Sequence, residues 1–191
     1  MIPEEIFEKA FDIESSVTEL QGKILFDLAK ETKGSIAELG SWKGRSSLIL
    51  AAGALAGNKQ KIYCVDTWKN CDLKPYFDFF PEWKKNITEA DLMQHCVPFI
   101  RDSAVAAREF DSSSFGLVFV DAWHTRIAVE NDFRAWWNRL IPEKGKMVFH
   151  DVIPAWPEII EFIEWLETQK QFGTVERMAS MAILTRTKEE N

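Results

Sequence analysis

The stretch AELGSWKGRSS, residues 37–47, contains the feature that decides the fold. Its two glycines, Gly40 and Gly44, are separated by three residues, and they lie between an apolar run at 35–39 and an alanine-rich run at 48–57. A strand, a glycine turn and a helix in this order form the first unit of an open α/β sheet. We therefore expect a strand over 35–39 and a helix over 45–57.

Short apolar runs alternate with longer amphipathic segments along the rest of the chain, which is typical of α/β proteins. Ser15 or Ser16 is a candidate amino-terminal cap for one of the helices. The alternation predicts a doubly wound, mostly parallel sheet of about seven strands, with helices on both faces and an antiparallel carboxyl-terminal hairpin at one edge. The further strands are expected at 61–66, 97–100, 115–121, 146–151, 172–177 and 180–186, and the further helices at 3–12, 16–32, 82–93, 124–140 and 157–170.

The length and composition favour one folded domain over residues 1–191. The chain has 191 residues, 46% of them hydrophobic, which suffices for one sizeable core. We expect amino-terminal helices over 1–33 and the α/β core over 34–191, with 67–93 as an unusually long connection.

The charge and the cysteines exclude several classes of protein. A net charge of -7 and a pI near 5.1 argue against nucleic acid as a partner, because phosphate binding needs a concentrated basic face. The acidic amino terminus lacks the features of a secretory signal, and no apolar run approaches the roughly 20 residues that span a bilayer. The three cysteines form no CxxC pair; they are Cys64, Cys71 and Cys96. We expect a cytoplasmic protein without a membrane partner, a disulfide framework or a structural zinc site.

Acidic residues follow most of the predicted strands. Ligands of open α/β sheets bind outside the carboxyl ends of the strands, so these positions are the candidate site. A single such residue is more often a solvated loop or a helix cap, but five positions on one edge favour a binding site. They are Glu38 to Gly44, Asp66, Asp102 with Ser103, Asp121 with His124, and His150 with Asp151.

The glycine turn does not match the common phosphate-binding motifs. A dinucleotide site has a second glycine where this chain has Trp42, and a P-loop needs one more residue between the glycines and a lysine where this chain has Arg45. The turn therefore suits a bulky ligand without phosphates. Asp66, which ends the second strand, is the kind of residue that accepts hydrogen bonds from ribose hydroxyls in α/β nucleotide sites.

Four motifs together resemble the class I S-adenosylmethionine-dependent methyltransferases, and in particular the catechol-type and bacterial small-molecule or sugar O-methyltransferases. They are ELGSWKGRS, VDTW, FVDAWH and HDVI, in order along residues 35–186. The resemblance implies a Rossmann-like sheet and S-adenosylmethionine as the cofactor. It assigns Glu38, Gly40, Ser41 and Gly44 to the methionine part, Asp66 to the ribose, Trp68 to the adenosine, and Asp102 and Ser103 to the adenine. Trp42 is either a cofactor contact or a packing residue, and Asp121 is counted with the cofactor contacts as well.

The same resemblance implies a divalent metal held by Asp121, His150 and Asp151. Carboxylates suit magnesium, whereas the imidazole of His150 favours zinc, manganese or iron, so either another metal binds, or His150 has another role, or no metal binds. His124 lies three residues after the strand-four acid, where catechol-type enzymes carry a basic residue. An imidazole is a suitable general base near neutral pH, so His124 is the first candidate base, with Asp121 and His150 as further catalytic candidates. His95 has no such position and is expected to be structural.

The aromatic segment 67–85 has several interpretations. It forms part of an acceptor pocket or a lid, or a helix whose stripe of Phe77, Phe80 and Lys84 packs on the body, or a contact in a homodimer. We expect an O-methyltransferase that acts on a small hydroxylated molecule. The alternatives are a metal-independent methyltransferase that uses His124 or His150 as its base, a cofactor-binding protein without catalysis, and a binder of nucleotide phosphates.

Overall fold

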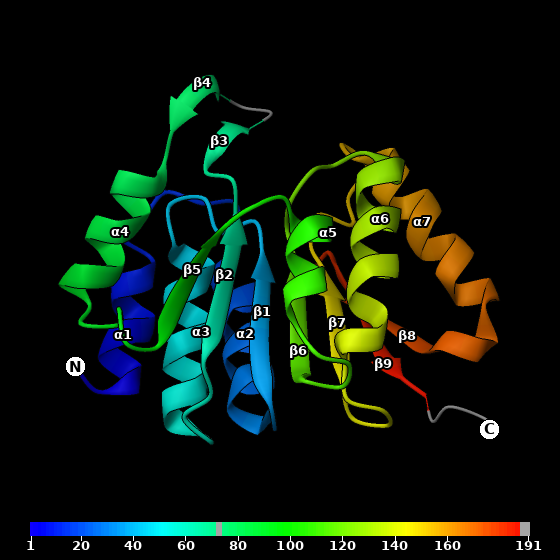
Figure 1. Cartoon of the computed structure of the whole chain (residues 1–191), viewed down its shortest axis with the longest axis horizontal. Helices are drawn as coiled ribbons and strands as arrows, with labels where there is room; N and C mark the ends of the chain where they lie inside the picture. The colour runs from blue at the N-terminus through cyan, green and yellow to red at the C-terminus, as the bar shows by residue number, and fades with distance from the viewer. Residues whose placement is uncertain (72–73, 188–191) are drawn as a thin grey trace.

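The computed structural model, which describes residues 1–71 and 74–187, contains a seven-stranded sheet (Figure 1). The strands lie in the order β5 (Cys96–Ile100), β2 (Ile62–Asp66), β1 (Ser35–Leu39), β6 (Phe115–Val120), β7 (Lys146–Phe149), β9 (Met181–Arg186) and β8 (Gly173–Met178). The first five are parallel to one another, and the final hairpin is antiparallel. The predicted mostly parallel sheet with a carboxyl-terminal hairpin at its edge is confirmed.

Helices cover both faces of this sheet. Figure 1 shows α2 (Glu19–Glu31) and α3 (Arg45–Ala56) behind β1 and β2, and α5 (Ser103–Ala106) in front of β6. The hydrophobic core of the first face also takes in α1 (Pro3–Ala10) and α4 (Phe80–Glu89). That of the second takes in α6 (Arg126–Trp136) and α7 (Pro157–Thr168). Three short 3-10 turns follow α5, α6 and α7, at Ala107–Glu109, Trp137–Arg139 and Lys170–Phe172.

The strands contribute alternate residues to the two cores because successive side chains of a strand point to opposite faces. In β6, Leu117 and Phe119 join the core with α3, whereas Val118 and Val120 join the core with α6. Both faces are therefore buried, which explains why these strands are continuous apolar runs in the sequence.

Two local expectations were wrong, and one small hairpin was not expected. Neither Ser15 nor Ser16 caps α2; Thr18 does so, because its hydroxyl accepts from the Gln21 amide while the Gln21 side chain accepts from the Thr18 amide. The segment after β2 forms a small hairpin, β3 (Lys69–Cys71) with β4 (Lys74–Asp78), and residues 72–73 of it lie outside the described part. Phe77 lies in this hairpin and is 58% exposed, so it shares no helical stripe with Phe80.

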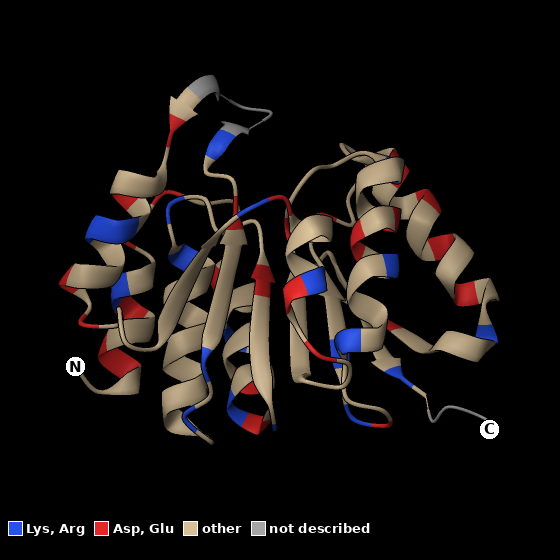
Figure 2. Cartoon of the chain, in the orientation of Figure 1, with Lys and Arg blue, Asp and Glu red and all other residues tan. Residues whose placement is uncertain are grey.

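The chain reverses its direction of winding between β1 and β6. From β1 it continues outward through β2 and β5, and it returns to the other side of β1 for β6 and β7. Ligands of doubly wound folds bind at the carboxyl edge beside such a switch point. Figure 2 shows acidic residues along this edge. In the described residues no helix is both long and apolar enough to cross a membrane.

Candidate active site

The glycine turn after β1 lies directly against the end of β6. Gly40 has φ 89°, and a Cβ placed on it would lie 2.0 Å from the backbone oxygen of Asp121. Gly44 has φ 97° and is the amino-terminal cap of α3. Both positions are in the left-handed region that glycine adopts without strain. The turn therefore needs both glycines for its backbone shape, and it exposes the start of α3 to the cavity.

The carboxylate of Asp66 holds the turn in place. Its Oδ2 accepts from the amides of Ser41 at 2.8 Å and Trp42 at 2.9 Å, and its Oδ1 accepts from the amide of Trp68 at 2.7 Å. Trp42 and Trp68 have φ values of 41° and 54°, which are uncommon for residues with a side chain. Asp66 thus stabilises two strained backbone positions at once, those of Trp42 and Trp68.

Glu38 lies beneath the turn rather than in the cavity. It is fully buried, and its Oε2 accepts from the hydroxyls of Ser41 at 2.6 Å and Ser47 at 2.5 Å. Burial raises the pKa of Glu38, and the serine hydroxyls oppose that shift. The predicted methionine-binding residue is thus positioned to support the turn through Ser41.

A segment of the amino-terminal region closes one side of the cavity. Arg45 donates from its guanidinium to the carbonyl oxygens of Ile13, Ser15 and Val17. Lys43 forms ion pairs with Glu14 at 2.8 Å and with Glu82 of α4 at 3.0 Å. These two cations of the glycine motif therefore bind the chain itself.

Two carboxylates and an imidazole meet at the ends of β6 and β7. Nδ1 of His150 lies 3.1 Å from Oδ1 of Asp121 and 3.3 Å from Oδ1 of Asp151. Burial favours neutral His150, but the two carboxylates outweigh it and raise the pKa of His150 to about 10. Burial also disfavours the Asp151 carboxylate, yet hydrogen bonds with His124 and His150 hold its pKa well below the usual range. Without a metal, a protonated His150 offsets part of the negative charge of the two acids.

The same three residues fit a divalent metal. Their ligand atoms all lie within 4.8 Å of one another. Two neighbouring ligands of one ion, each bonded at about 2.1 Å, lie about 3 Å apart, as Nδ1 of His150 does from one oxygen of each acid. Two oxygens and one imidazole nitrogen suit zinc, manganese or iron better than magnesium. The metal-bound form requires a neutral His150, so metal binding would compete with a proton.

His124 lies next to this cluster. Its Nε2 is 2.9 Å from Oδ2 of Asp151, and its ring stacks on Trp156 with centroids 4.2 Å apart. Asp151 has φ 55°, so the residue between the two histidines is in a strained backbone conformation. A carboxylate that fixes the orientation of an imidazole is the arrangement of many general bases.

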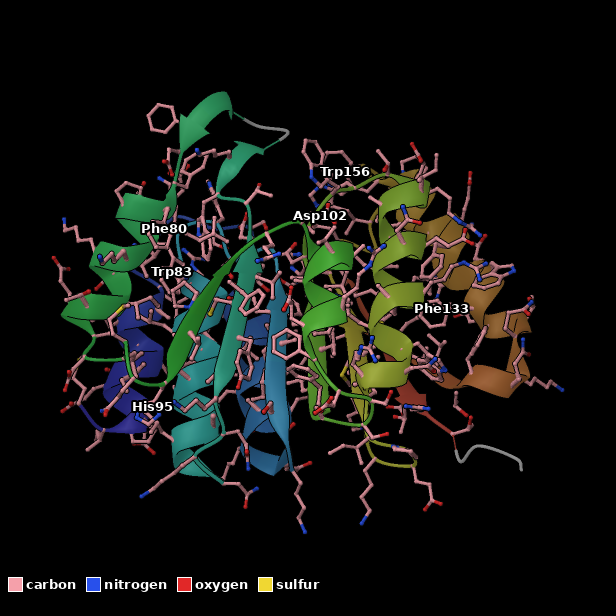
Figure 3. All side chains as sticks on the ribbon, in the orientation of Figure 1. Phe80, Trp83, His95, Asp102, Phe133 and Trp156 are labelled. Carbon is pink, nitrogen blue, oxygen red and sulfur yellow. The ribbon has the colours of Figure 1, made fainter. Side chains whose placement is uncertain are left out.

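A cavity of about 1210 Å³, including its open mouth, joins these groups. Figure 3 shows Asp102 and Trp156 at this edge of the sheet and His95 toward the opposite edge. Of the predicted site residues, the cavity is lined by Gly40, Ser41, Trp42, Gly44, Asp66, Trp68, Asp102, Ser103, Asp121, His124 and Asp151. Glu38 and His150 do not line it. Both are buried directly behind residues that do, Glu38 behind Ser41 and His150 behind Asp121 and Asp151.

The two tryptophans beside the turn differ in their surroundings. Trp68 is only 1% exposed, packs on Phe80 and Trp83, and donates from Nε1 to the carbonyl of Trp42. Trp42 is half-buried, and its buried Nε1 has no hydrogen-bond partner within the part of the chain that the structure describes. Trp68 is thus mainly a core residue, whereas Trp42 lines the cavity and its indole N–H is buried without a described partner.

Sequence reasoning missed several residues of the cavity wall. Ser46 lies in the first turn of α3, and Ser15 and Ser16 were considered only as helix caps. Lys43 lies in the predicted stretch 38–44, and Thr67, Lys69 and Phe79 lie in the aromatic segment 67–85, one interpretation of which was an acceptor pocket. The missed lining residues are Glu14, Ser15, Ser16, Arg45, Ser46, Val65, Arg101, Ala122, Trp123 and Trp156. Sequence spacing gave no signal for the residues of 14–16, because Arg45 and Lys43 bring them to the cavity from about thirty positions away.

Residues 37–152 match a family model described as a methyltransferase domain. The chain belongs to this methyltransferase family. The match spans the glycine turn, Asp66, the β6 acid and the His150–Asp151 pair. The expected class I S-adenosylmethionine-dependent methyltransferase is confirmed.

Several solved methyltransferases are similar to this methyltransferase in fold. TomG, an O-methyltransferase of tomaymycin synthesis from Streptomyces achromogenes solved with SAM, has a TM-score of 0.72 and 19% identity over 96% of this chain and 90% of its own. The SAH-bound Podospora anserina methyltransferase PaMTH1 has a TM-score of 0.74 and 14% identity over 98% and 88%. A Bacillus cereus O-methyltransferase in complex with SAH has a TM-score of 0.65 and 15% identity over 96% and 90%. At these identities the similarity shows the shared fold.

Proposed function

We propose that this methyltransferase transfers a methyl group from S-adenosylmethionine to a hydroxyl oxygen of a small molecule. The observation that carries the proposal is the single cavity edge on which the glycine turn, Asp66, Asp121 and His124 meet. As part of this proposal, we expect the adenine at the end of β5, the ribose at β2, the methionine part at the turn after β1, and the reacting methyl group toward β6 and β7, because ligands of such sheets bind along the carboxyl ends of the strands.

The start of α3 suits the carboxylate of the methionine part. Ser46 lies in its first turn and lines the cavity, and the amides at a helix amino terminus favour an anion. Asp66 already accepts three amide hydrogens, so it holds the turn in shape and has about one lone pair of the roughly four on a carboxylate for a ribose hydroxyl.

The residues at the ends of β6 and β7 suit the reacting end. S-adenosylmethionine supplies a methyl group on a positively charged sulfur, and the acceptor oxygen must approach it in line and lose its proton. His124, oriented by Asp151, is the candidate that takes the proton. Trp123 and Trp156 border the same space. A divalent ion held by Asp121, His150 and Asp151 would lower the pKa of the acceptor hydroxyl.

A metal-independent reaction is the second candidate. It is favoured by the pairing of His150 with both acids, because a protonated imidazole offsets part of their negative charge without an ion. In that case His124 acts as the base, and His150 keeps Asp121 and Asp151 in place.

Titration calorimetry with S-adenosylhomocysteine tests the cofactor, with Asp66→Ala alongside. Micromolar binding that is lost in the variant supports the proposal, and no binding to the native protein refutes it. Mass spectrometry of a panel of phenols, catechols and sugars, incubated with S-adenosylmethionine, then tests transfer. Turnover that survives a chelator favours the metal-independent reaction, and binding without turnover on any acceptor favours a cofactor-binding protein.

A further inference from the structure

A buried acid on α6 contacts the base end of the cavity, and the reaction proposed above gives it no role. Asp132 is 3% exposed, and its Oδ1 accepts a hydrogen bond from the hydroxyl of Ser103. Ser103 is the first residue of α5 and lines the cavity next to Asp102. Asp132 therefore acts on the cavity through Ser103 and not by lining it.

A second contact from α6 fixes the backbone of the same serine. Trp136 is fully buried, and its Nε1 donates to the carbonyl oxygen of Ser103 at 3.0 Å. Asp132 and Trp136 are four residues apart, so they lie on one face of α6. One helix face thus holds both the hydroxyl and the carbonyl of Ser103, and the position of the serine is fixed from outside the cavity.

The direction of the first hydrogen bond has a chemical consequence. A serine hydroxyl has one hydrogen, so a serine that donates to Asp132 has only lone pairs left for a ligand. The neighbouring carboxylate of Asp102 also accepts hydrogen bonds, and its Oδ1 already accepts from the amide of Val105. Both side chains at the end of β5 are therefore acceptors.

We propose that Asp132 is a positioning residue that determines which nucleobase the cavity prefers. By accepting the hydroxyl hydrogen of Ser103, it makes the end of the cavity beside β5 select a purine with an exocyclic amino group. This inference rests on the proposed function. Adenine offers that amino group as a donor, whereas hypoxanthine has a carbonyl oxygen at the same position and would face acceptors. Burial, the largest cause, raises the pKa of Asp132 to about 7.

The test compares the dissociation constants of S-adenosylhomocysteine and of its deaminated analogue, S-inosylhomocysteine, by calorimetry. The wild-type protein should prefer the adenosyl ligand by roughly 10- to 100-fold, the size expected when one hydrogen bond is replaced by two facing acceptors. Asp132→Leu leaves the Ser103 hydroxyl free to donate, so the preference should fall about tenfold. Ser103→Ala should produce a similar fall, mainly by weakening the adenosyl ligand.

Two further variants separate specificity from packing. Asp132→Asn keeps an acceptor oxygen at the same place and should keep most of the preference. Glu130→Gln makes the same charge change on α6 and is the control, because Glu130 pairs with Arg134 and does not line the cavity. It should leave the preference for the adenosyl ligand unchanged. If Asp132→Leu does not fold, Asp132→Ala replaces it, with circular dichroism as the check.

The outcomes of this test are distinct. A wild-type preference that Asp132→Leu and Asp132→Ala leave unchanged overturns the inference, as does an equal loss of both ligands, which marks a packing role. If the wild-type protein binds neither ligand, the proposed function fails and the inference fails with it.

Discussion

Arg45→Lys is expected to open the segment of residues 11–18 that closes one side of the cavity. The guanidinium of Arg45 donates to three carbonyl oxygens of this segment, those of Ile13, Ser15 and Val17. A lysine keeps the positive charge, but one ammonium group cannot reach three carbonyls in the fixed fork geometry of a guanidinium. The substitution should therefore remove two of the three carbonyl contacts.

The size of the effect follows from those two contacts. A hydrogen bond to a charged group contributes about 1.5 kcal/mol at the low end of its range, so the closed segment should lose about 3 kcal/mol. At about 1.4 kcal/mol per factor of ten, the ratio of closed to open segment falls roughly 150-fold. In the open form, Glu14, Ser15 and Ser16 no longer line the cavity. Once the open form dominates, the apparent affinity for the ligand falls in proportion to the fraction of closed protein.

Hydrogen exchange followed by mass spectrometry measures this opening directly, because amide protection reports the free energy of local opening. Protection of the peptide that covers residues 11–18 should fall about 100-fold, and S-adenosylhomocysteine should restore part of it. Arg139→Lys is the matched control, since Arg139 donates to the carbonyl of Ala107, outside the residues that line the cavity. Unchanged protection in Arg45→Lys would refute the role given to the guanidinium.

Three other predictions follow from the site. Asp66→Asn places an amide group against the N–H donors of Ser41, Trp42 or Trp68. The variant should bind S-adenosylhomocysteine at least about tenfold more weakly in calorimetry, and its free energy of unfolding in urea should be about 2 kcal/mol lower. Asp27→Asn, on the exposed face of α2, should change neither quantity. The pKa of Asp132 is about 7 in the folded protein against 3.8 ordinarily, so the folded state keeps the proton at higher pH and the free energy of unfolding falls as pH rises between these values. In urea unfolding, the stability of Asp132→Asn relative to the wild type should therefore increase by about 3 kcal/mol from pH 5 to pH 8. A difference between the two proteins that does not change with pH would contradict the burial argument. After chelator treatment, Mn²⁺ or Zn²⁺ should raise the Tm of the protein by several degrees and Mg²⁺ by less, and Asp121→Asn should abolish the increase. If no ion raises the Tm, the result would favour a cluster in which a protonated His150 pairs with both acids and no metal binds.

The parts of the fold that the sequence predicted well are those with a strong local signal. The expected strand at 35–39 is β1 to the residue, because a short apolar run that ends in a glycine turn has few other structures open to it. The small hairpin after β2 was not predicted, since its aromatic residues follow neither the period of a strand nor that of a helix. The start of α2 was missed although the chain carries the signal, a threonine at 18 followed by a glutamine three residues later.

The sequence predicted the site residues that lie at the ends of strands. It did not predict the residues whose position depends on tertiary contacts. Asp66, Asp121 and Asp151 line the cavity as strand order suggested. Arg45 was considered only as a failed phosphate ligand, because its carbonyl partners lie 28 to 32 residues earlier in the chain. The burial of Glu38 depends on how the turn folds over it, and the contact between Asp132 and Ser103 depends on how α6 packs on α5. Neither is visible in the spacing of residues.

The close approach of Gly40 to residue 121 bears on how such an enzyme changes its chemistry over evolution. The glycine packs against the backbone oxygen of Asp121 and makes no use of its carboxylate. A new side chain at position 121 would therefore alter the reacting end while the backbone of the turn after β1 kept its shape. In proteins with this architecture, single substitutions at the ends of β6 and β7 can therefore create or remove dependence on a metal while the turn that would bind the methyl donor keeps its shape.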